Sequence, residues 1–121
     1  MDRFDLGRIG EEEAVRHLRA RGWVIVGRNV RCGPRELDVI AIRGRVLAFV
    51  EVKSRKGRDF GHPFEAITLA KQKEVARAAR VWLQNRALPY GTLIRFDAIS
   101  VLVSGTDRAE VTHLPDAWRL S

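Results

Sequence analysis

The order in which helical and strand-like periodicities follow one another along the 121-residue chain predicts an α/β domain. Apolar residues at helical spacing predict a first helix from Ile9 to Arg21 and a second from Leu69 to about Arg86. Thr68 is the expected N-cap of the second helix. Residues 1–8 show little periodicity, so they are expected to precede the first helix as a loosely ordered segment.

Short apolar runs with a two-residue period predict five strands. In chain order they cover residues 23–26, 35–42, 45–53, 94–103 and 110–114. The first strand is expected to break at Gly27, followed by a basic loop over 28–35 that turns at Gly33-Pro34. No repeat or linker divides the chain, so residues 1–121 are predicted to form a single domain with a central mixed sheet of about five strands.

The two central strands carry three ionisable residues, Asp38, Glu51 and Lys53, among positions that are otherwise almost all apolar. A two-residue turn at Arg43-Gly44 would make Asp38 and Glu51 diagonal neighbours on one face, with Glu36 opposite Glu51. A three-residue loop would place the two acids on opposite faces. Any site that needs both acids therefore depends on the register of this hairpin.

Two carboxylates on adjacent strands suit a magnesium ion, which binds through one or two carboxylates plus substrate phosphate. Asp38 and Glu51 would be these ligands, the carbonyl of Val52 could add another, and Glu11 could reach the ion from the inward face of the first helix. Lys53 shares the face of Glu51 and could neutralise a phosphate and help to place an attacking water. The same pattern is also typical of a charged pair on a solvated strand.

The charge balance favours a polyanionic partner, since 22 Lys and Arg residues face 15 Asp and Glu residues and the formal net charge is +7. Nucleic acid is the first candidate, and an anionic membrane the second. The residues expected to contact phosphate border the proposed site: Arg28, Arg31, Arg35, Arg55, Lys56 and Arg58. They could equally be ordinary solvated charges. Gln72, on the inward stripe of the second helix, could touch substrate or only cap the sheet.

The remaining composition excludes several kinds of site and several classes of protein. Cys32 is the only cysteine, which excludes an internal disulfide and a cysteine-rich zinc site. The longest apolar run, Val46 to Val50, is far too short to span a membrane, and the first residues do not resemble a signal peptide. We therefore expect a cytoplasmic protein without membrane association.

The whole pattern resembles the YraN family of endonuclease-like bacterial proteins, within the PD-(D/E)xK nuclease superfamily and related to Holliday-junction resolvases. The segments that carry the resemblance are Gly7–Glu11, Gly22-Trp23, Arg28–Arg31, Glu36–Ala41, Phe49–Lys53, Phe60–Pro63, Glu65–Thr68, Lys71–Lys73 and Arg95–Asp97. Leu37 departs from the proline of the superfamily, and Arg35 from the usual glycine of the family.

The resemblance implies a restriction-endonuclease-like fold and Mg²⁺- or Mn²⁺-dependent hydrolysis of phosphodiester bonds in DNA, including branched or otherwise non-standard DNA. The metal and catalytic roles would fall on Glu11, Asp38, Glu51 and Lys53. A homodimer is expected by analogy with the resolvases. The alternative is a non-catalytic module that binds nucleic acid or a partner and retains only the fold.

Overall fold

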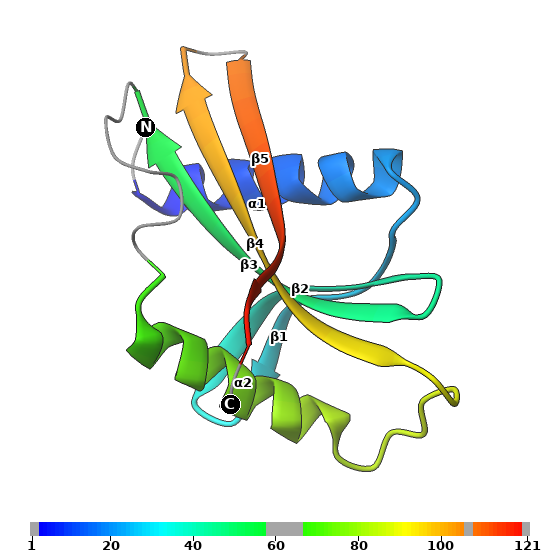
Figure 1. Cartoon of the computed structure of the whole chain (residues 1–121). Helices are drawn as coiled ribbons and strands as arrows, with labels where there is room; N and C mark the ends of the chain where they lie inside the picture. The colour runs from blue at the N-terminus through cyan, green and yellow to red at the C-terminus, as the bar shows by residue number, and fades with distance from the viewer. Residues whose placement is uncertain (1–2, 58–66, 106–107, 120–121) are drawn as a thin grey trace.

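The computed structural model describes residues 3–57, 67–105 and 108–119, and confirms an α/β fold with a five-stranded mixed sheet and two helices (Figure 1). The elements are α1 (Arg3–Ala20), β1 (Val24–Cys32), β2 (Arg35–Arg43), β3 (Val46–Lys56), α2 (Leu69–Leu83), β4 (Leu93–Ser104) and β5 (Arg108–Trp118). The strands lie in chain order. Among the strands of the described residues, only β3 and β4 pair in parallel, because α2 lies between them in the chain and allows a crossover. Within the described residues, neither helix is long and apolar enough to cross a membrane.

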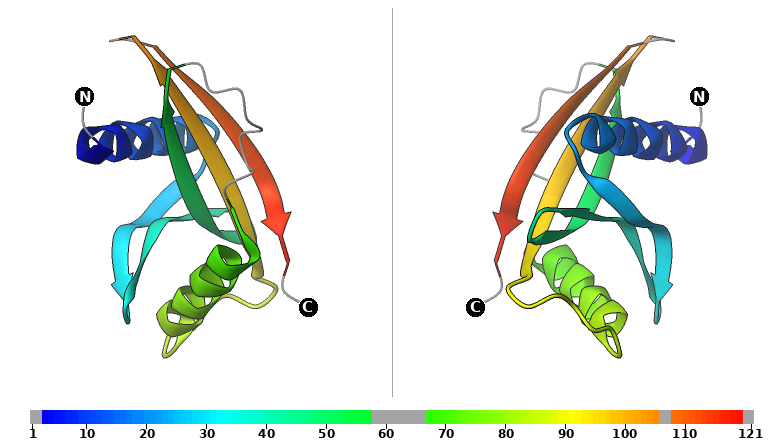
Figure 2. Two further views of the ribbon diagram at one scale, coloured as in Figure 1. Left: turned by 90° about the vertical axis from the view of Figure 1, so that its left-hand side faces the viewer. Right: turned by 90° about the vertical axis from the view of Figure 1, so that its right-hand side faces the viewer.

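The two helices cover opposite faces of the sheet, and each completes a hydrophobic core there (Figures 1 and 2). The core at α1 includes Ala14, Val15, Leu18, Val39, Ala41, Val50 and Ile99. The core at α2 includes Ile40, Leu47, Phe49, Val75, Ala79, Ala98 and Trp118. Successive residues of one strand, such as Val39 and Ile40, thus face different helices, as the two-residue period requires. The sheet is strongly twisted, which turns β1 and β2 relative to the longer strands β3 to β5 (Figure 2).

The N-terminal elements are longer than the sequence predicted. Helix α1 begins at Arg3 rather than Ile9, because Leu6 and Ile9 extend its apolar stripe by about one turn against the core. Strand β1 continues through Gly27 to Cys32. A bulge between Ile25 and Gly27 absorbs the irregularity, so the expected basic loop is instead a strand paired with β2. The predicted turn at Gly33-Pro34 is confirmed, since Cys32 pairs with Arg35 across it.

Three further boundaries differ from the prediction. Strand β3 extends to Lys56, paired with Val103 of β4, so the following loop starts later. Helix α2 ends at Leu83 instead of near Arg86. Strand β5 runs to Trp118, which is buried, instead of ending at residue 114. Residues 58–66 lie outside the described residues.

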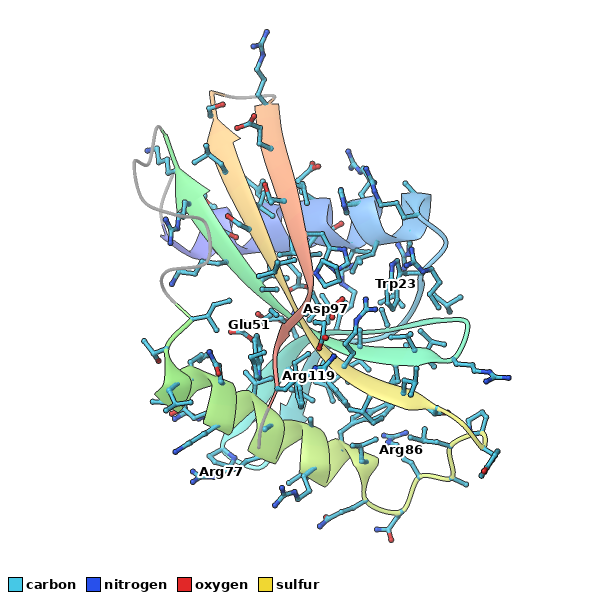
Figure 3. The ribbon with its side chains drawn as sticks, in the orientation of Figure 1. Trp23, Glu51, Arg77, Arg86, Asp97 and Arg119 are labelled. Carbon is cyan, nitrogen blue, oxygen red and sulfur yellow. The ribbon has the colours of Figure 1, made fainter. Side chains whose placement is uncertain are left out.

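A buried acid ties β4 to β5. Asp97 is fully buried, and its carboxylate accepts two hydrogen bonds of 2.8 Å from Arg95, one of 2.9 Å from the backbone N–H of Asp116, and a 2.8 Å contact with Nε2 of His113. Burial alone would raise the pKa of Asp97. The hydrogen bonds from His113 and Arg95 outweigh burial and lower this pKa to about 2. Asp97, labelled in Figure 3, is therefore a charged structural group whose burial is compensated by its partners.

Helix α1 approaches β3 closely at Gly10. A Cβ atom at position 10 would lie 1.7 Å from Oγ and 2.8 Å from Cβ of Ser54. The same construction at Gly7 meets nothing within 4 Å. The close approach of α1 to β3 thus depends on Gly10, one residue before Glu11.

We predict that Gly10→Ala destabilises the protein, although alanine is the better helix former by about 1 kcal/mol. The clash with Ser54 forces α1 away from β3, and overpacking of this kind costs about 1–3 kcal/mol. Gly7→Ala is the matched control and should be neutral or slightly stabilising. Urea denaturation of the three proteins measures the difference. Equal destabilisation by both substitutions would contradict the close contact.

Candidate active site

The β2–β3 hairpin turns at Gly44 and Arg45, and its register brings the two strand acids together. Val39 pairs with Val50 and Ile40 with Phe49, so the register continued by one residue sets Asp38 opposite Glu51. The predicted turn at Arg43-Gly44 is wrong by one residue. Hairpin turns that match the strand twist need positive φ at their first central position, and Gly44 supplies a φ of 60°. The correction shifts the register by two residues and preserves the shared face.

Asp38 lies where β2 and β3 separate. The backbone pairing of the two strands reaches Val39 and Val50, and beyond it Oδ2 of Asp38 accepts a 2.8 Å hydrogen bond from the backbone N–H of Val52. The expected alternation of side chains is also interrupted here, because Leu37 packs in the core at α2 and Val39 in the core at α1. The carboxylate of Asp38 thus takes the place of a backbone partner, which holds it beside β3.

Glu51 lies where the sheet meets α2 (Figure 3). Its side chain is 11% exposed, and Oε1 lies 3.3 Å from Nζ of Lys71 on α2. Burial raises the pKa of Glu51 to about 7, the negative charge of Asp38 adds to this, and Lys71 opposes it. Burial also raises the pKa of Asp38, against the N–H of Val52. The negative charge of two neighbouring carboxyl groups in a poorly solvated place is incompletely balanced here. This imbalance favours the binding of a cation.

Two open grooves meet at this acidic pair. The larger has a volume of about 950 Å³ and is lined by Leu6, Gly7, Arg8, Glu11, Glu12, Arg28, Asn29, Glu36, Asp38, Val52, Lys53 and Ser54. The smaller, of about 470 Å³, extends toward the start of α2 and is lined by Asp38, Glu51, Val52, Lys53, Ile67, Thr68, Ala70, Lys71 and Glu74. Asp38, Val52 and Lys53 belong to both. A ligand in the smaller groove therefore reaches both acids, and a ligand in the larger groove reaches Asp38.

Lys53 is exposed at the junction of the grooves. Among the described residues, no acidic side chain forms an ion pair with it. Its ammonium group is thus available to an anionic ligand that enters either groove.

Glu11 reaches the larger groove but does not join Asp38 and Glu51 as a third ligand. Its Oε1 accepts hydrogen bonds of 3.1 Å from Arg28 and 2.9 Å from Asn29, both on β1. In the described part of the chain, no three His, Cys, Asp or Glu side chains are grouped closely enough to hold a metal ion. The structure thus brings two of the three predicted carboxylates together, and a metal role for Glu11 stays a prediction.

The acidic pair fits a divalent cation by its own chemistry. A magnesium site needs only one or two protein carboxylates when water and substrate phosphate complete the shell. Asp38 and Glu51 provide these two, and the raised pKa of each shows that the protein leaves their charge incompletely balanced. Val52 lines both grooves beside them, and its carbonyl stays a predicted ligand.

Several of the cations expected to contact phosphate are engaged by acids. Arg28 pairs with Glu11 at 3.0 Å and with Glu12 at 2.6 Å. Arg31 lies 4.0 Å from Glu36, and Arg35 pairs with Glu74 of α2. A phosphate would have to compete with these carboxylates.

The other predicted contacts have different surroundings. Lys56 is exposed and Arg55 half-buried at the end of β3, and Arg58 lies outside the described residues. Gln72 donates a 3.3 Å hydrogen bond to the carbonyl of Ile67, and it lines neither groove. Its surroundings favour a local structural role at the start of α2.

Sequence reasoning missed Lys71 as a member of the site. The available signal was its position four residues before Val75, which is buried in the core at α2. Sequence reasoning placed Gln72 on this inward face instead. It also missed the outer face of α2, where Lys73, Arg77 and Arg80 are exposed and, within the described chain, form no ion pair. Figure 3 labels Arg77 on this helix.

Fold and site together define a class: an α/β protein with a five-stranded mixed sheet between two helices and an acidic pair at the junction of two grooves. The model of the Uncharacterised protein family UPF0102 matches residues 10–101. The chain belongs to the UPF0102 family, which confirms the resemblance to the YraN family.

Full-length relatives agree with this assignment. A UPF0102 protein of Nocardia farcinica is 46% identical over 113 residues, covering 93% of this chain and 88% of the relative. A UPF0102 protein of Syntrophotalea carbinolica is 46% identical over 116 residues, covering 96% and 93%. A UPF0102 protein of Chlorobaculum tepidum is 44% identical over 118 residues, covering 93% and 91%.

The raised pKa of Glu51 predicts a specific dependence of stability on pH in metal-free buffer. Because the pKa rises from 4.5 to about 7 on folding, the folded state binds more protons than the unfolded state in this window. The free energy of unfolding therefore falls as the pH rises through it. Glu51→Gln removes this loss. Between pH 5 and pH 8, the free energy of unfolding of Glu51→Gln should therefore rise by about 2 kcal/mol relative to that of wild type.

Urea denaturation with EDTA at the two pH values tests this prediction. Glu110→Gln, an exposed substitution on β5, is the control and should follow wild type. Asp97, with its pKa of about 2, stays ionised across the range in all three proteins. Parallel pH profiles for wild type and Glu51→Gln would contradict the assigned environment of Glu51.

Proposed function

We propose that this protein is a Mg²⁺-dependent endonuclease, active also with Mn²⁺, that hydrolyses phosphodiester bonds in DNA, including branched or otherwise non-standard DNA. The observation that carries the proposal is the pair Asp38 and Glu51, whose carboxyl groups have raised pKa values. Both line the smaller groove and Asp38 also lines the larger, beside Lys53, which forms no ion pair within the described residues. An under-compensated acidic pair next to an available cation suits a metal ion and a phosphodiester better than it suits a purely structural sheet.

Each residue has a role that follows from its surroundings. Asp38 and Glu51 hold the ion, and the Val52 N–H keeps the carboxylate of Asp38 in place. The bound ion supplies charge neutralisation and lowers the pKa of water. Lys53 contacts the phosphate and stabilises the charge that develops on it. The cytoplasmic location and the homodimer remain predictions from sequence and analogy.

A second candidate function is metal-independent binding of nucleic acid. It is favoured by the outer face of α2, where Lys73, Arg77 and Arg80 are exposed and, in the described chain, unpaired. Such a row of cations can contact phosphates without any metal. The two candidates differ in whether cleavage accompanies binding.

We expect purified protein to cleave at least one of linear, flapped and four-way DNA substrates with Mg²⁺ or Mn²⁺. Glu51→Gln should lower the cleavage rate by at least about 10²-fold, because it removes a charged ligand. Gel analysis of labelled substrates measures the rates, with Glu110→Gln as the control that should retain wild-type activity.

Glu51→Gln should remain folded and still bind DNA, so its inactivity would not reflect a general loss of structure. Absence of cleavage by wild type on all three substrates, with DNA binding intact, would favour the non-catalytic module. Equal cleavage by wild type and Glu51→Gln would contradict the assigned site.

The proposed contact of α2 with phosphate predicts what reversing the charge of two arginines on this helix will do. Arg77→Glu/Arg80→Glu should weaken DNA binding about tenfold at moderate salt and lower the salt slope by about 1.8, as expected for two lost phosphate contacts. Fluorescence anisotropy without divalent metal measures both quantities. Arg19→Glu/Arg108→Glu changes the net charge equally at exposed positions on α1 and β5 and should have a smaller effect. Equal losses in both variants would indicate attraction by net charge alone.

A further inference from the structure

A lysine of α2, across the smaller groove, forms an ion pair with one of the two acids. Nζ of Lys71, on α2, lies 3.3 Å from Oε1 of Glu51 on β3. Within the described residues, no other Lys or Arg side chain forms an ion pair with Glu51 or Asp38. The cation that compensates these acids therefore comes from the helix, although the strand itself carries Lys53 two residues after Glu51.

The two partners of this ion pair differ in solvation. The side chain of Glu51 is 11% exposed, whereas that of Lys71 is 42% exposed. The lysine thus reaches the buried carboxylate from a position that is already partly in water. It can withdraw into the groove without losing much buried contact, whereas Glu51 cannot leave its place in the sheet.

We infer that Lys71 is the resident counter-cation of Asp38 and Glu51, and that a divalent metal ion displaces it. This inference rests on the proposed function, because it concerns how the same site takes up its metal. Both cations require the carboxylate oxygens of Glu51, and an ammonium group left beside a divalent ion would be strongly repelled in this poorly solvated place. The protein therefore exchanges one cation for another.

The exchange has two consequences. Metal affinity is lowered by the free energy needed to break the pair of Lys71 with Glu51. The displaced ammonium group remains in the smaller groove, which Thr68 and Ala70 also line. There it can donate hydrogen bonds to a phosphate. Phosphate binding then favours metal binding, and by linkage metal binding favours phosphate to the same extent.

Titration with Mn²⁺ alone, without DNA, tests the inference by isothermal titration calorimetry. Lys71→Met keeps the length and apolar stem of the side chain but removes the competing charge, so Mn²⁺ should bind about fivefold more tightly than to wild type. Lys71→Arg keeps the charge and should restore affinity close to that of wild type. Lys73→Met, on the same helix and exposed, is the matched control and should match wild type. A pH of 8.5 prevents protons from competing for the carboxylates.

Thermal melting provides a second readout that also shows that each variant folds. Without metal, Lys71→Met should melt below wild type, because its acids lack a counter-cation. A saturating concentration of Mn²⁺ should then raise its Tm by more than that of wild type. Equal or weaker Mn²⁺ binding by Lys71→Met, with wild-type binding intact, would overturn the inference and leave the proposed function standing. If wild type and Lys71→Met both fail to bind Mn²⁺, the metal-dependent function itself fails, and the inference with it.

Discussion

The turn at Gly44 and Arg45 sets which residues of β2 and β3 face each other, and both the core and the site depend on this register. Ile40 and Phe49 pair across the strands and are fully buried in the core at α2. Asp38 and Glu51 lie two residues further along the same strands. A slip of one residue would move the side chains of a strand to the other face and remove Phe49 from the core at α2. The packing that stabilises the sheet thus also holds the two acids together, at an electrostatic cost.

The sheet buries acidic side chains in two places and compensates them differently. Asp97 receives hydrogen bonds from Arg95 and the Asp116 N–H and contacts His113, and its pKa falls to about 2. At Glu51 the pKa instead rises to about 7, because burial and a neighbouring carboxylate outweigh one lysine. The fold can therefore satisfy a buried carboxylate within its own structure. Incomplete compensation beside open grooves is for this reason better explained by an external cation than by poor packing.

Most of the fold could be predicted from the sequence, because periodicity and local signals determine it. The α/β order, the N-cap Thr68 and the shared face of Asp38 and Glu51 all follow from residue spacing. The register was wrong by two residues, since it depends on which turn residue adopts positive φ. The role of Lys71 could not be foreseen, because it depends on how α2 docks across the sheet and on the reach of a long side chain. Tertiary packing determines that contact.

Tertiary packing also changes what the net charge of +7 implies. The charged residues that line the larger groove are the basic Arg8, Arg28 and Lys53 and the acidic Glu11, Glu12, Glu36 and Asp38. The groove has no excess of positive charge, so it does not by itself attract a phosphodiester. Attraction of a phosphodiester over longer distances would have to come from cations outside the groove, such as Arg77 and Arg80 on the outer face of α2. Entry of a phosphate into the groove then requires that the acids be neutralised first. A divalent ion at Asp38 and Glu51 would meet this requirement and would make cleavage, but not initial binding, dependent on metal.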